Sequence, residues 1–495
     1  MPMRAGIARG QERFLPRTLE EAIPAGHPVR FVVAFIELLK ERGLGLRRVV
    51  QRGGRARYDP YLLLAVWVYG FMTRIRSTRR LQRACEEILP FIWLACEERP
   101  DHVTLARFFQ ANREVVREVF KQTVEVAAKS DLLGFAVHAI DGTRIASVSA
   151  KRALSPKRMQ ELLDRTEVAI TEMEKALAAE SQEGATDDRM PDELKDAVQL
   201  RRRLVQALEV SKSRKAARRG NSRGVKDRET GRDAGPRVSL ADPEAVLMKG
   251  AHGFVAGYNA QAAVDVKAQI IVGAELVADG TDTAQLPKML EEVKETAGGL
   301  AMVTACDAGY HSLENLEATQ GEATNLYVSD PALKRANGPE TSVFHKDRFE
   351  YNADADTYTC PEGKLLVFGW QGKAGKGKPV VRVYRCDDCP ACRHFGICTK
   401  DREGRRLKVR EEDALLKQHR KKMRGEAAKF WMKVRATLVE PTFGIMREQL
   451  GLNRFLRRGE KNAKAEWLLT CAAYNVNKII RYTTREGASM ALAPI

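Results

Sequence analysis

The spacing of apolar residues along the first part of the chain predicts helices. In Ala22–Arg42 the apolar side chains recur at helical spacing, which places them on one face of a helix. Pro60 begins a second, strongly apolar helix, and Asp101 or Thr104 is suited to cap another. Residues 1–130 are therefore predicted to form an all-helical N-terminal domain.

The middle of the chain changes to short apolar runs rich in β-branched residues, which predict strands. One run is Phe135–Ser147, and two more, Gly257–Val266 and Ile270–Ala278, flank a short turn and predict a hairpin. The pattern then predicts a helix, a strand, a helix and a strand, at Thr283–Ala297, Ala301–Cys306, Ser312–Ala318 and Asn325–Ser329. Three strands, helix, strand, helix, strand is the element order of an RNase H-like fold. The chain is therefore predicted to be an α/β protein with such a core.

Two segments interrupt the predicted core. Arg158–Ala179 and Asp192–Leu208 lie in a charge-rich stretch and are predicted to be amphipathic helices forming a hairpin arm, with a basic linker behind them. The second segment holds five of the nine cysteines. The predicted parts are the helical N-terminal domain at 1–130, the core at 131–150 and 236–340, the arm and linker at 151–235, the Cys-rich insertion at 341–410, and the C-terminal helices completing the core at 411–484.

Two of the predicted strands end in an acid. Asp141 and Asp307 follow buried runs, and the element order makes their strands neighbours at the centre of the sheet. A carboxylate in such a place is costly unless it is paired or binds a cation. Glu440 lies in a predicted helix that starts or kinks at the following Pro441. Three hard oxygen ligands suit a pair of Mg²⁺ or Mn²⁺ ions. The alternative is that all three are ordinary surface acids, and the competing acids nearby are Asp265, Asp279 and Asp282.

The Cys-rich insertion has the spacing of a structural zinc site. Cys389 and Cys392 are separated by two residues, and such a turn aims both sulfurs at one tetrahedral ion. Cys360 and Cys398 complete a predicted set of four zinc ligands, with Cys386 as a substitute. The alternative is a group of reduced cysteines without metal.

The chain of 495 residues carries a formal net charge of +18, which suits a polyanion and makes nucleic acid the first candidate partner. Short helices joined by basic turns are typical of helix-turn-helix DNA binders, and a helical bundle with a solvated basic rim is the alternative. Phosphate contact is expected in both cases, from Arg74, Arg76, Arg79 and Arg80. No window has the apolar length of a membrane span and the N-terminus lacks an apolar signal core, so a cytoplasmic protein without a membrane partner is expected.

Several stretches together resemble the DDE transposases of bacterial insertion sequences. They run from about residue 13 to residue 478, and Gly257–Gln261 and Val439–Gly444 carry the most specific of them. The stretches are R-Y-D-P-Y-L-L-L, I-R-S-T-R-R-L, F-I-W-L, R-P-D-H-V-T-L-A-R-F, A-I-D-G-T-R-I, H-G-F-V-A-G-Y-N-A-Q-A-A-V-D, C-D-A-G-Y-H-S, V-E-P-T-F-G-I-M-R-E and R-F-L-R-R-G-E-K-N-A-K-A-E-W.

The resemblance implies a role for residues in these stretches. Asp141, Asp307 and Glu440 match the family's three catalytic metal ligands, which hold two Mg²⁺ or Mn²⁺ ions. Arg447 stands where the family has a basic residue after the Glu. The further DNA contacts are expected at Tyr310, His311, Arg457, Arg458 and Lys461.

The implied activity is cleavage at the terminal inverted repeats of the element and joining of the ends to target DNA. The implied partner is double-stranded DNA, bound by a homodimer because an element has two ends. Two alternatives stay open: a metal-dependent nuclease that cuts without joining, and a catalytically idle or domesticated DNA-binding protein. The idle protein is expected to have lost a ligand position, and the sequence retains all three.

Overall fold

A computed structural model of the protein describes residues 18–48, 58–148, 153–182, 192–217, 235–250, 253–334, 343–373, 380–410 and 413–485. Most of the basic linker predicted behind the arm lies outside these ranges. The fold is a mixture of helices and strands, as the sequence predicts. Among the described residues, no helix is both long and apolar enough to cross a membrane.

The N-terminal part is helical throughout its described residues. Its helices are α1 (Leu19–Ala22), α2 (Pro28–Glu41), α3 (Pro60–Met72), α4 (Thr78–Glu87), α5 (Leu89–Leu94), α6 (His102–Asn112) and α7 (Val116–Lys129). Asp101 begins α6 as a cap, because its Oδ1 accepts hydrogen bonds of 2.8 Å from the backbone N–H groups of Val103 and Thr104. Helix α3 is apolar around its whole circumference, and its last ten residues are buried.

A mixed sheet forms the centre of the molecule. Its strands are β1 (Val137–Ala146), β4 (Val246–Gly250), β5 (Gly253–Asp265), β6 (Ile271–Val277), β7 (Val303–Cys306) and β8 (Asn325–Val328). Strand β5 pairs with β6, β4 and β1, all antiparallel, and β7 joins β1 to β8 in parallel. Helices α10 (Leu286–Ala297) and α11 (Leu313–Ala318) follow β6 and β7, so strands and helices alternate in the predicted order.

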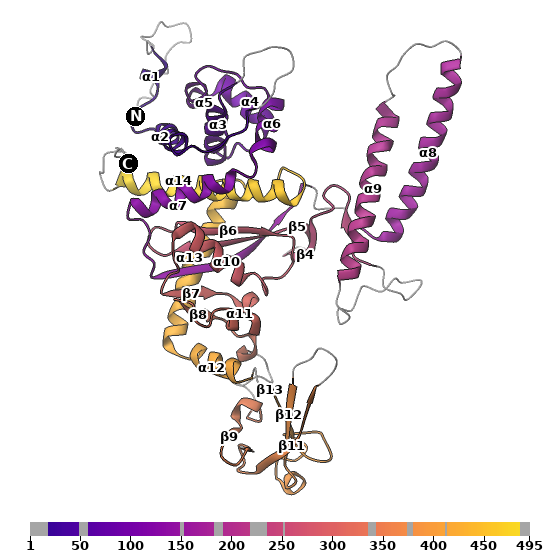
Figure 1. Ribbon diagram of the computed structural model, residues 1–495, viewed down its shortest axis with the longest axis vertical. Helices are drawn as coiled ribbons and strands as arrows, with labels where there is room; N and C mark the ends of the chain where they lie inside the picture. The colour runs from indigo at the N-terminus through magenta and orange to yellow at the C-terminus, as the bar shows by residue number, and fades with distance from the viewer. Residues whose placement is uncertain are drawn as a thin grey trace, which may run out of the picture.

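The last helix, α14 (Glu460–Arg485), lies between the N-terminal helices and the sheet (Figure 1). Asn475 fixes it there through three hydrogen bonds. Its amide donates to Thr123 on α7 at 3.1 Å and to the carbonyl of Ile271 on β6 at 2.9 Å, and it accepts from the Ile271 N–H at 2.9 Å. One apolar core runs through all these elements, from α2 to α14.

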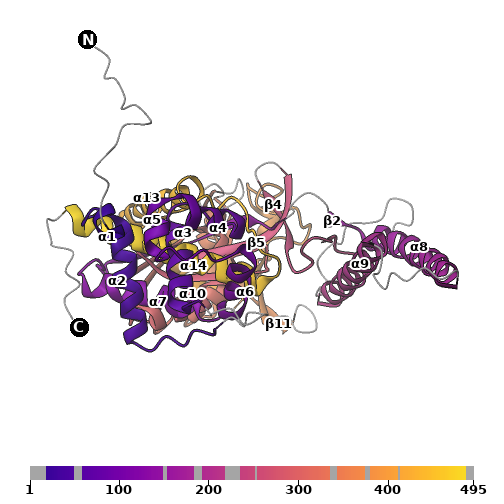
Figure 2. The same cartoon turned by 90° about the horizontal axis from the view of Figure 1, so that it is seen from above.

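Two long helices, α8 (Pro156–Gln182) and α9 (Asp192–Ala217), form a hairpin that stands away from the body in both views (Figures 1 and 2). Strands β2 (Ala153–Leu154) and β3 (Val238–Ser239) pair at its base. The two helices bury a small apolar core of their own, and Arg201 on α9 pairs with Glu167 on α8 at 3.2 Å.

The Cys-rich insertion contains a five-stranded antiparallel sheet that the sequence analysis did not predict. Its order is β13-β12-β11-β10-β9. The strands are β9 (Glu350–Asn352), β10 (Thr357–Thr359), β11 (Leu365–Lys373), β12 (Val380–Arg385) and β13 (Arg406–Arg410). They are short, and β11 shifts register between Phe368 and Trp370, so their apolar residues do not alternate regularly. Helix α12 (Asp413–Met423) leads from this sheet back to the core.

Helix α13 (Glu426–Glu448) carries Glu440 and continues through Pro441. Of the two predicted alternatives, a start or a kink at Pro441, the structure excludes the start. Proline removes one backbone donor, which leaves the carbonyl of the residue four positions earlier without its helical partner. That residue, Thr437, is exposed, as is Pro441, so water can satisfy the carbonyl.

Candidate active site

Parallel pairing of β1 and β7 brings Asp141 and Asp307 to the same edge of the sheet. The register pairs Ile140 with Cys306, and each aspartate is the next residue on its strand. Asp307 then begins a 3₁₀ turn, η1 (Ala308–Tyr310), and its Oδ1 accepts from the Gly309 N–H at 2.8 Å. The two carboxylates thus lie at corresponding positions of neighbouring strands.

The surroundings of Asp141 disfavour its charged form. Burial raises the pKa of Asp141 to about 6, and the negative charge of Asp307 adds to the shift. The guanidinium of Arg435 on α13 acts in the opposite direction, with Nη1 at 3.0 Å from Asp141 Oδ2. Two hard oxygen donors on neighbouring strands are chemically suited to a divalent cation.

Glu440 is not part of this pair in the structure. Its side chain is exposed, and within the described residues no hydrogen bond or ion pair joins it to Asp141 or Asp307. Across the described ranges, no three His, Cys, Asp or Glu side chains converge closely enough to hold a metal ion. The structure therefore assembles two of the three predicted ligands and leaves the third on α13.

An open cleft of about 710 Å³ lies beside Asp307. Cations line part of it: Arg447 donates a hydrogen bond to the Thr143 hydroxyl, and Arg144 donates to the carbonyl of Lys249. A second acid, Asp282, lines the same cleft. Carboxylates beside arginines form a surface that can hold a phosphodiester next to bound cations.

Asp282 is a site residue to which the sequence analysis gave no role beyond that of a competing acid. The amides of Asn259 and Gln261 on β5 both donate to its Oδ1, each at 2.7 Å. The spacing of Asn259 and Gln261 was the available signal, because residues two apart on a strand face the same side of the sheet. The sequence does not show which acid they meet.

Two of the predicted DNA-binding arginines are buried inside the protein. Arg76 is 6% exposed, and its Nη1 lies 2.8 Å from Oε1 of Glu466, which is fully buried. Arg457 stacks on two aromatic rings, 4.6 Å from the centre of Trp67 and 3.9 Å from that of Phe109. In this structure neither side chain is available to a phosphate, and both instead join the N-terminal helices to the segment around α14.

The other predicted basic contacts are exposed. Arg74 donates to the carbonyl of Glu448 at 3.1 Å and so lies beside the end of α13. The remaining exposed cations of the prediction are Arg79, Arg80, Arg447, Arg458 and Lys461.

The two predicted contacts next to Asp307 are turned inward. Tyr310 is fully buried and donates its hydroxyl hydrogen to Gln261 Oε1, and burial raises its pKa far above the usual range. His311 lies 3.5 Å from Asp330 and packs near His419. Tyr310 therefore orients Gln261 in this structure and does not face DNA.

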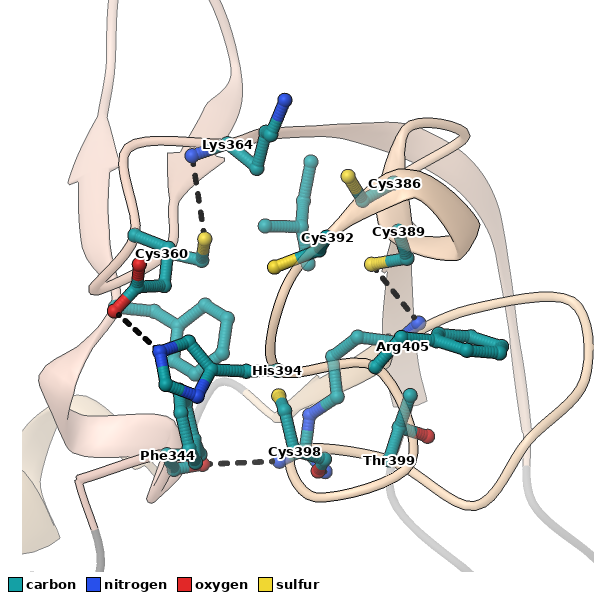
Figure 3. Close-up of a pocket in the computed structure, with 14 residues that line it drawn as sticks. Phe344, Cys360, Lys364, Cys386, Cys389, Cys392, His394, Cys398, Thr399 and Arg405 are labelled. Carbon is teal, nitrogen blue, oxygen red and sulfur yellow. Dashed lines mark hydrogen bonds and ion pairs between the residues drawn. The ribbon is translucent and has the colours of Figure 1, made fainter.

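The five cysteines of the insertion surround a cavity of about 20 Å³, large enough for a single water molecule or ion (Figure 3). Backbone N–H groups donate to two of the sulfurs, Lys364 to Cys360 at 3.2 Å and Arg405 to Cys389 at 3.3 Å. The sulfurs lie too far apart for coordination, since the described side chains include no cluster of metal-binding geometry.

Cys398 and Cys386 differ in their relation to the other sulfurs. Burial raises the pKa of Cys398, and so do the charges of the three other predicted ligands, Cys360, Cys389 and Cys392. Cys386 is buried in the small core of the insertion, which raises its pKa to about 11, and it is hydrogen-bonded to Cys389. Cys386 therefore resembles a packing residue more than the other four do.

Comparisons with protein families match two stretches of the chain. Residues 17–111, which include α1 to α6, match a family described as "Transposase domain (DUF772)". Residues 359–480, which include most of the Cys-rich insertion, α12, α13 and much of α14, match a family described as "Transposase DDE domain". The second match contains Glu440, while Asp141 and Asp307 lie outside both. No curated protein matches the chain.

Proposed function

Because the chain belongs, by these two matches, to the DDE transposases of insertion sequences, we propose that it binds the terminal inverted repeats of its element, cleaves there and joins the ends to target DNA. The observation that carries this proposal is the adjacency of Asp141, within β1, and Asp307, directly after β7, beside a cleft with arginines. The transposase resemblance drawn from the sequence is confirmed, and such a family implies DNA as the substrate and a nuclease or transposase activity.

The carboxylates would hold the metal. Asp141 and Asp307 fit a divalent cation as paired oxygen donors, and Glu440 would join them from α13 once Arg435 releases Asp141. Two bound Mg²⁺ or Mn²⁺ ions would supply activation of the attacking oxygen and stabilisation of the leaving oxygen.

The cleft would position the DNA strand. Arg447 and Arg144 lie where they can hold phosphate oxygens against the carboxylate edge. Hydrolysis at an element end exchanges one phosphodiester oxygen for that of water and frees a 3′-hydroxyl. That hydroxyl then attacks a target phosphodiester, so both steps are the same displacement and one cleft serves both.

The exposed cations of the N-terminal helices and of the α13–α14 segment would contact phosphates along the element end. Arg79, Arg80, Arg458 and Lys461 remain in this proposed surface, and the buried Arg76 and Arg457 are left out of it. Two element ends require two protomers in the active assembly, so a DNA-bound homodimer is part of the proposal.

The Cys-rich insertion would carry one structural zinc ion. The support is a cavity with the sulfurs of Cys360, Cys389, Cys392 and Cys398 around it and backbone donors to two of them. Closing this group on a metal requires only that the loops bearing the sulfurs contract. Zinc would stabilise the five-stranded sheet, since four thiolates leave no position for a reacting water.

Strand cleavage on the DNA that flanks the gene tests the proposal. Purified wild type with Mg²⁺ or Mn²⁺ is expected to cut at discrete flanking positions, and Asp307→Asn is expected to lose this cutting. Asp279→Asn is the matched control, because Asp279 is exposed and bonds only to nearby Thr281 among the described residues. Binding without cutting by the wild type would favour the idle DNA-binding protein. Cutting without joined products would favour the nuclease.

A further inference from the structure

We infer that Asp282 is a further carboxylate of the active site, held by Asn259 and Gln261 so that its free oxygen faces Asp307 and shares the cation that Asp307 binds. The inference rests on the proposed function, because it concerns the same cleft. It also accounts for the Gly-Tyr-Asn-Ala-Gln stretch, which the proposed chemistry does not otherwise use.

The two carboxylates meet across Gly309. A Cβ added to Gly309 would lie 2.8 Å from Asp282 Oδ2 and 3.0 Å from Asp307 Oδ1. Both oxygens therefore border one small space that any side chain at this position would enter. Two carboxylate oxygens that face each other repel unless a proton or a cation lies between them.

Gly142 likewise leaves space beside the Asp282 carboxylate, on its other side. A Cβ on Gly142, the residue after Asp141, would lie 2.6 Å from Asp282 Oδ1 and 2.4 Å from Gln261 Nε2. Neither Gly142 nor Gly309 has a positive φ, so the backbone conformation does not demand glycine at either position. What glycine provides at both is space for the Asp282 carboxylate beside the two aspartates.

The partners of Asp282 fix its orientation without neutralising it. Both amide donors bind Oδ1, which leaves Oδ2 directed at Gly309 and Asp307. Within the described residues, no ion pair involves Asp282, in contrast to Asp141 with its Arg435. A carboxylate held by neutral amides keeps its full charge for a cation.

Tyr310 sets the orientation of Gln261. Its hydroxyl donates to Gln261 Oε1, so the amide nitrogen of Gln261 points at Asp282. Tyr310 is itself held by Asn315, whose amide donates to the Tyr310 carbonyl at 2.6 Å. The turn that carries Asp307 thus also positions the amide that holds Asp282.

A purely structural role for Asp282 makes a different prediction. The backbone carbonyl of Asp282, not its side chain, accepts the Gln285 N–H at the start of α10. Asn at position 282 keeps a carbonyl oxygen that can accept both amide bonds and removes only the charge. Asp282→Asn therefore tests the negative charge alone, because the hydrogen bonds that hold the side chain are kept.

Mn²⁺ titration of the full-length protein, followed by electron paramagnetic resonance, tests the inference. Asp282→Asn is expected to weaken Mn²⁺ binding about 10-fold or more, Asp307→Asn to weaken it at least as much, and Asp279→Asn to leave it unchanged. Unchanged binding in Asp282→Asn with loss in Asp307→Asn would overturn the inference and leave the proposed function standing. Unchanged binding in both would remove the proposed metal site as well.

A measurement on the wild type covers the case in which Asp282→Asn fails to fold. Fe²⁺ bound in place of Mg²⁺ reduces added hydrogen peroxide to a hydroxyl radical and hydroxide and becomes Fe³⁺, which added ascorbate reduces again, and the radicals cut the backbone next to the metal. Cuts are expected around residue 282 as well as around residues 141 and 307. Cuts at 141 and 307 with none near 282 would contradict the inference, and competition by excess Mg²⁺ shows that the iron occupies the same site.

Discussion

Arg435 Nη1 donates a hydrogen bond of 3.0 Å to Oδ2 of Asp141, so the helix that bears Glu440 also places a positive charge on the first aspartate. Two side chains of α13 are therefore placed differently, since one contacts the site and the other does not. Arg435 is engaged with Asp141, while Glu440 is exposed. A cation that binds Asp141 has to displace this guanidinium.

Replacing Arg435 by Gln is expected to tighten Mn²⁺ binding about tenfold, because a fixed charge at this distance repels a second cation by on the order of a kilocalorie or more. The measurement is a Mn²⁺ titration at pH 8, above the pKa of about 6 that burial gives Asp141. Lys433→Gln, an exposed change on the same helix, is the control and is expected to have no effect. Weaker Mn²⁺ binding in Arg435→Gln would show that Arg435 orients Asp141 instead of competing.

Replacing Gly309 by Ala is expected to abolish DNA cleavage while leaving the fold intact. The new methyl group would occupy the space between Asp282 and Asp307, and both carboxylates are flexible enough to move aside. Moving the two carboxylates aside costs about 1–3 kcal/mol of the free energy of unfolding. Gly299→Ala is the matched control, since a Cβ there meets nothing within 4 Å. Retained cleavage in Gly309→Ala would show that the space between the carboxylates has no function.

Replacing Arg76 by Ala is expected to destabilise the protein by about 1–3 kcal/mol, because it removes one of the two arginines that pair with the buried Glu466 carboxylate and leaves Arg457 at 3.3 Å as the other. Urea unfolding followed by circular dichroism measures the change. Arg80→Ala, an exposed change four residues away, is expected to leave the unfolding midpoint unchanged and to weaken DNA binding at low salt. Normal stability in Arg76→Ala would argue against the buried ion pair.

Asp265 is expected to contribute stability that is lost in acid. Burial raises its pKa, but the nearby His138, with Nε2 3.6 Å from Oδ2, and the hydrogen bonds from the N–H groups of Lys267, Gly134 and Phe135 outweigh burial and lower it overall. A folded pKa below the unfolded value stabilises the protein above the unfolded pKa of about 3.9, and this contribution disappears as the pH falls through the folded pKa. Asp265→Asn should therefore lower the urea midpoint at pH 7 and flatten its decline between about pH 5 and pH 3. A parallel decline in both proteins would contradict this role.

Removal of single cysteines tests the zinc proposal. One zinc ion per chain is expected by inductively coupled plasma mass spectrometry. Cys389→Ser is expected to lose the ion, and Cys386→Ser, which removes the hydrogen-bonded neighbour, is expected to retain it. If the wild-type protein contains no zinc after purification and still has an intact far-ultraviolet circular dichroism spectrum, the cysteines are simply reduced.

Local signals in the chain were enough to identify the acids of the two central strands, although β1 continues past Asp141 to Ala146 and does not end there as predicted. Apolar runs that stop at Asp141 and Asp307 identify both acids, and the order of strands and helices indicates that the two strands are neighbours. The starts of α3 and α6 could also be predicted from the sequence, since Pro60 and Asp101 favour a helix start through groups within the next few residues. The sheet of the Cys-rich insertion could not be predicted from the sequence, because apolar and polar residues do not alternate regularly in strands with a register shift.

Long-range contacts decided the rest. Arg76 and Arg80 look alike in I-R-S-T-R-R, and only the approach of Glu466, 390 positions along the chain, makes Arg76 a buried ion-pair partner. Asp282 resembles Asp279 until folding brings the segment after β6 beside Asn259 and Gln261 of β5. The sequence by itself therefore determined the elements and the candidate acids, because propensity and capping act over a few residues. Only the tertiary structure decided which of several residues of the same type are buried, which are paired and which face the cleft. Those states depend on groups that only folding brings together.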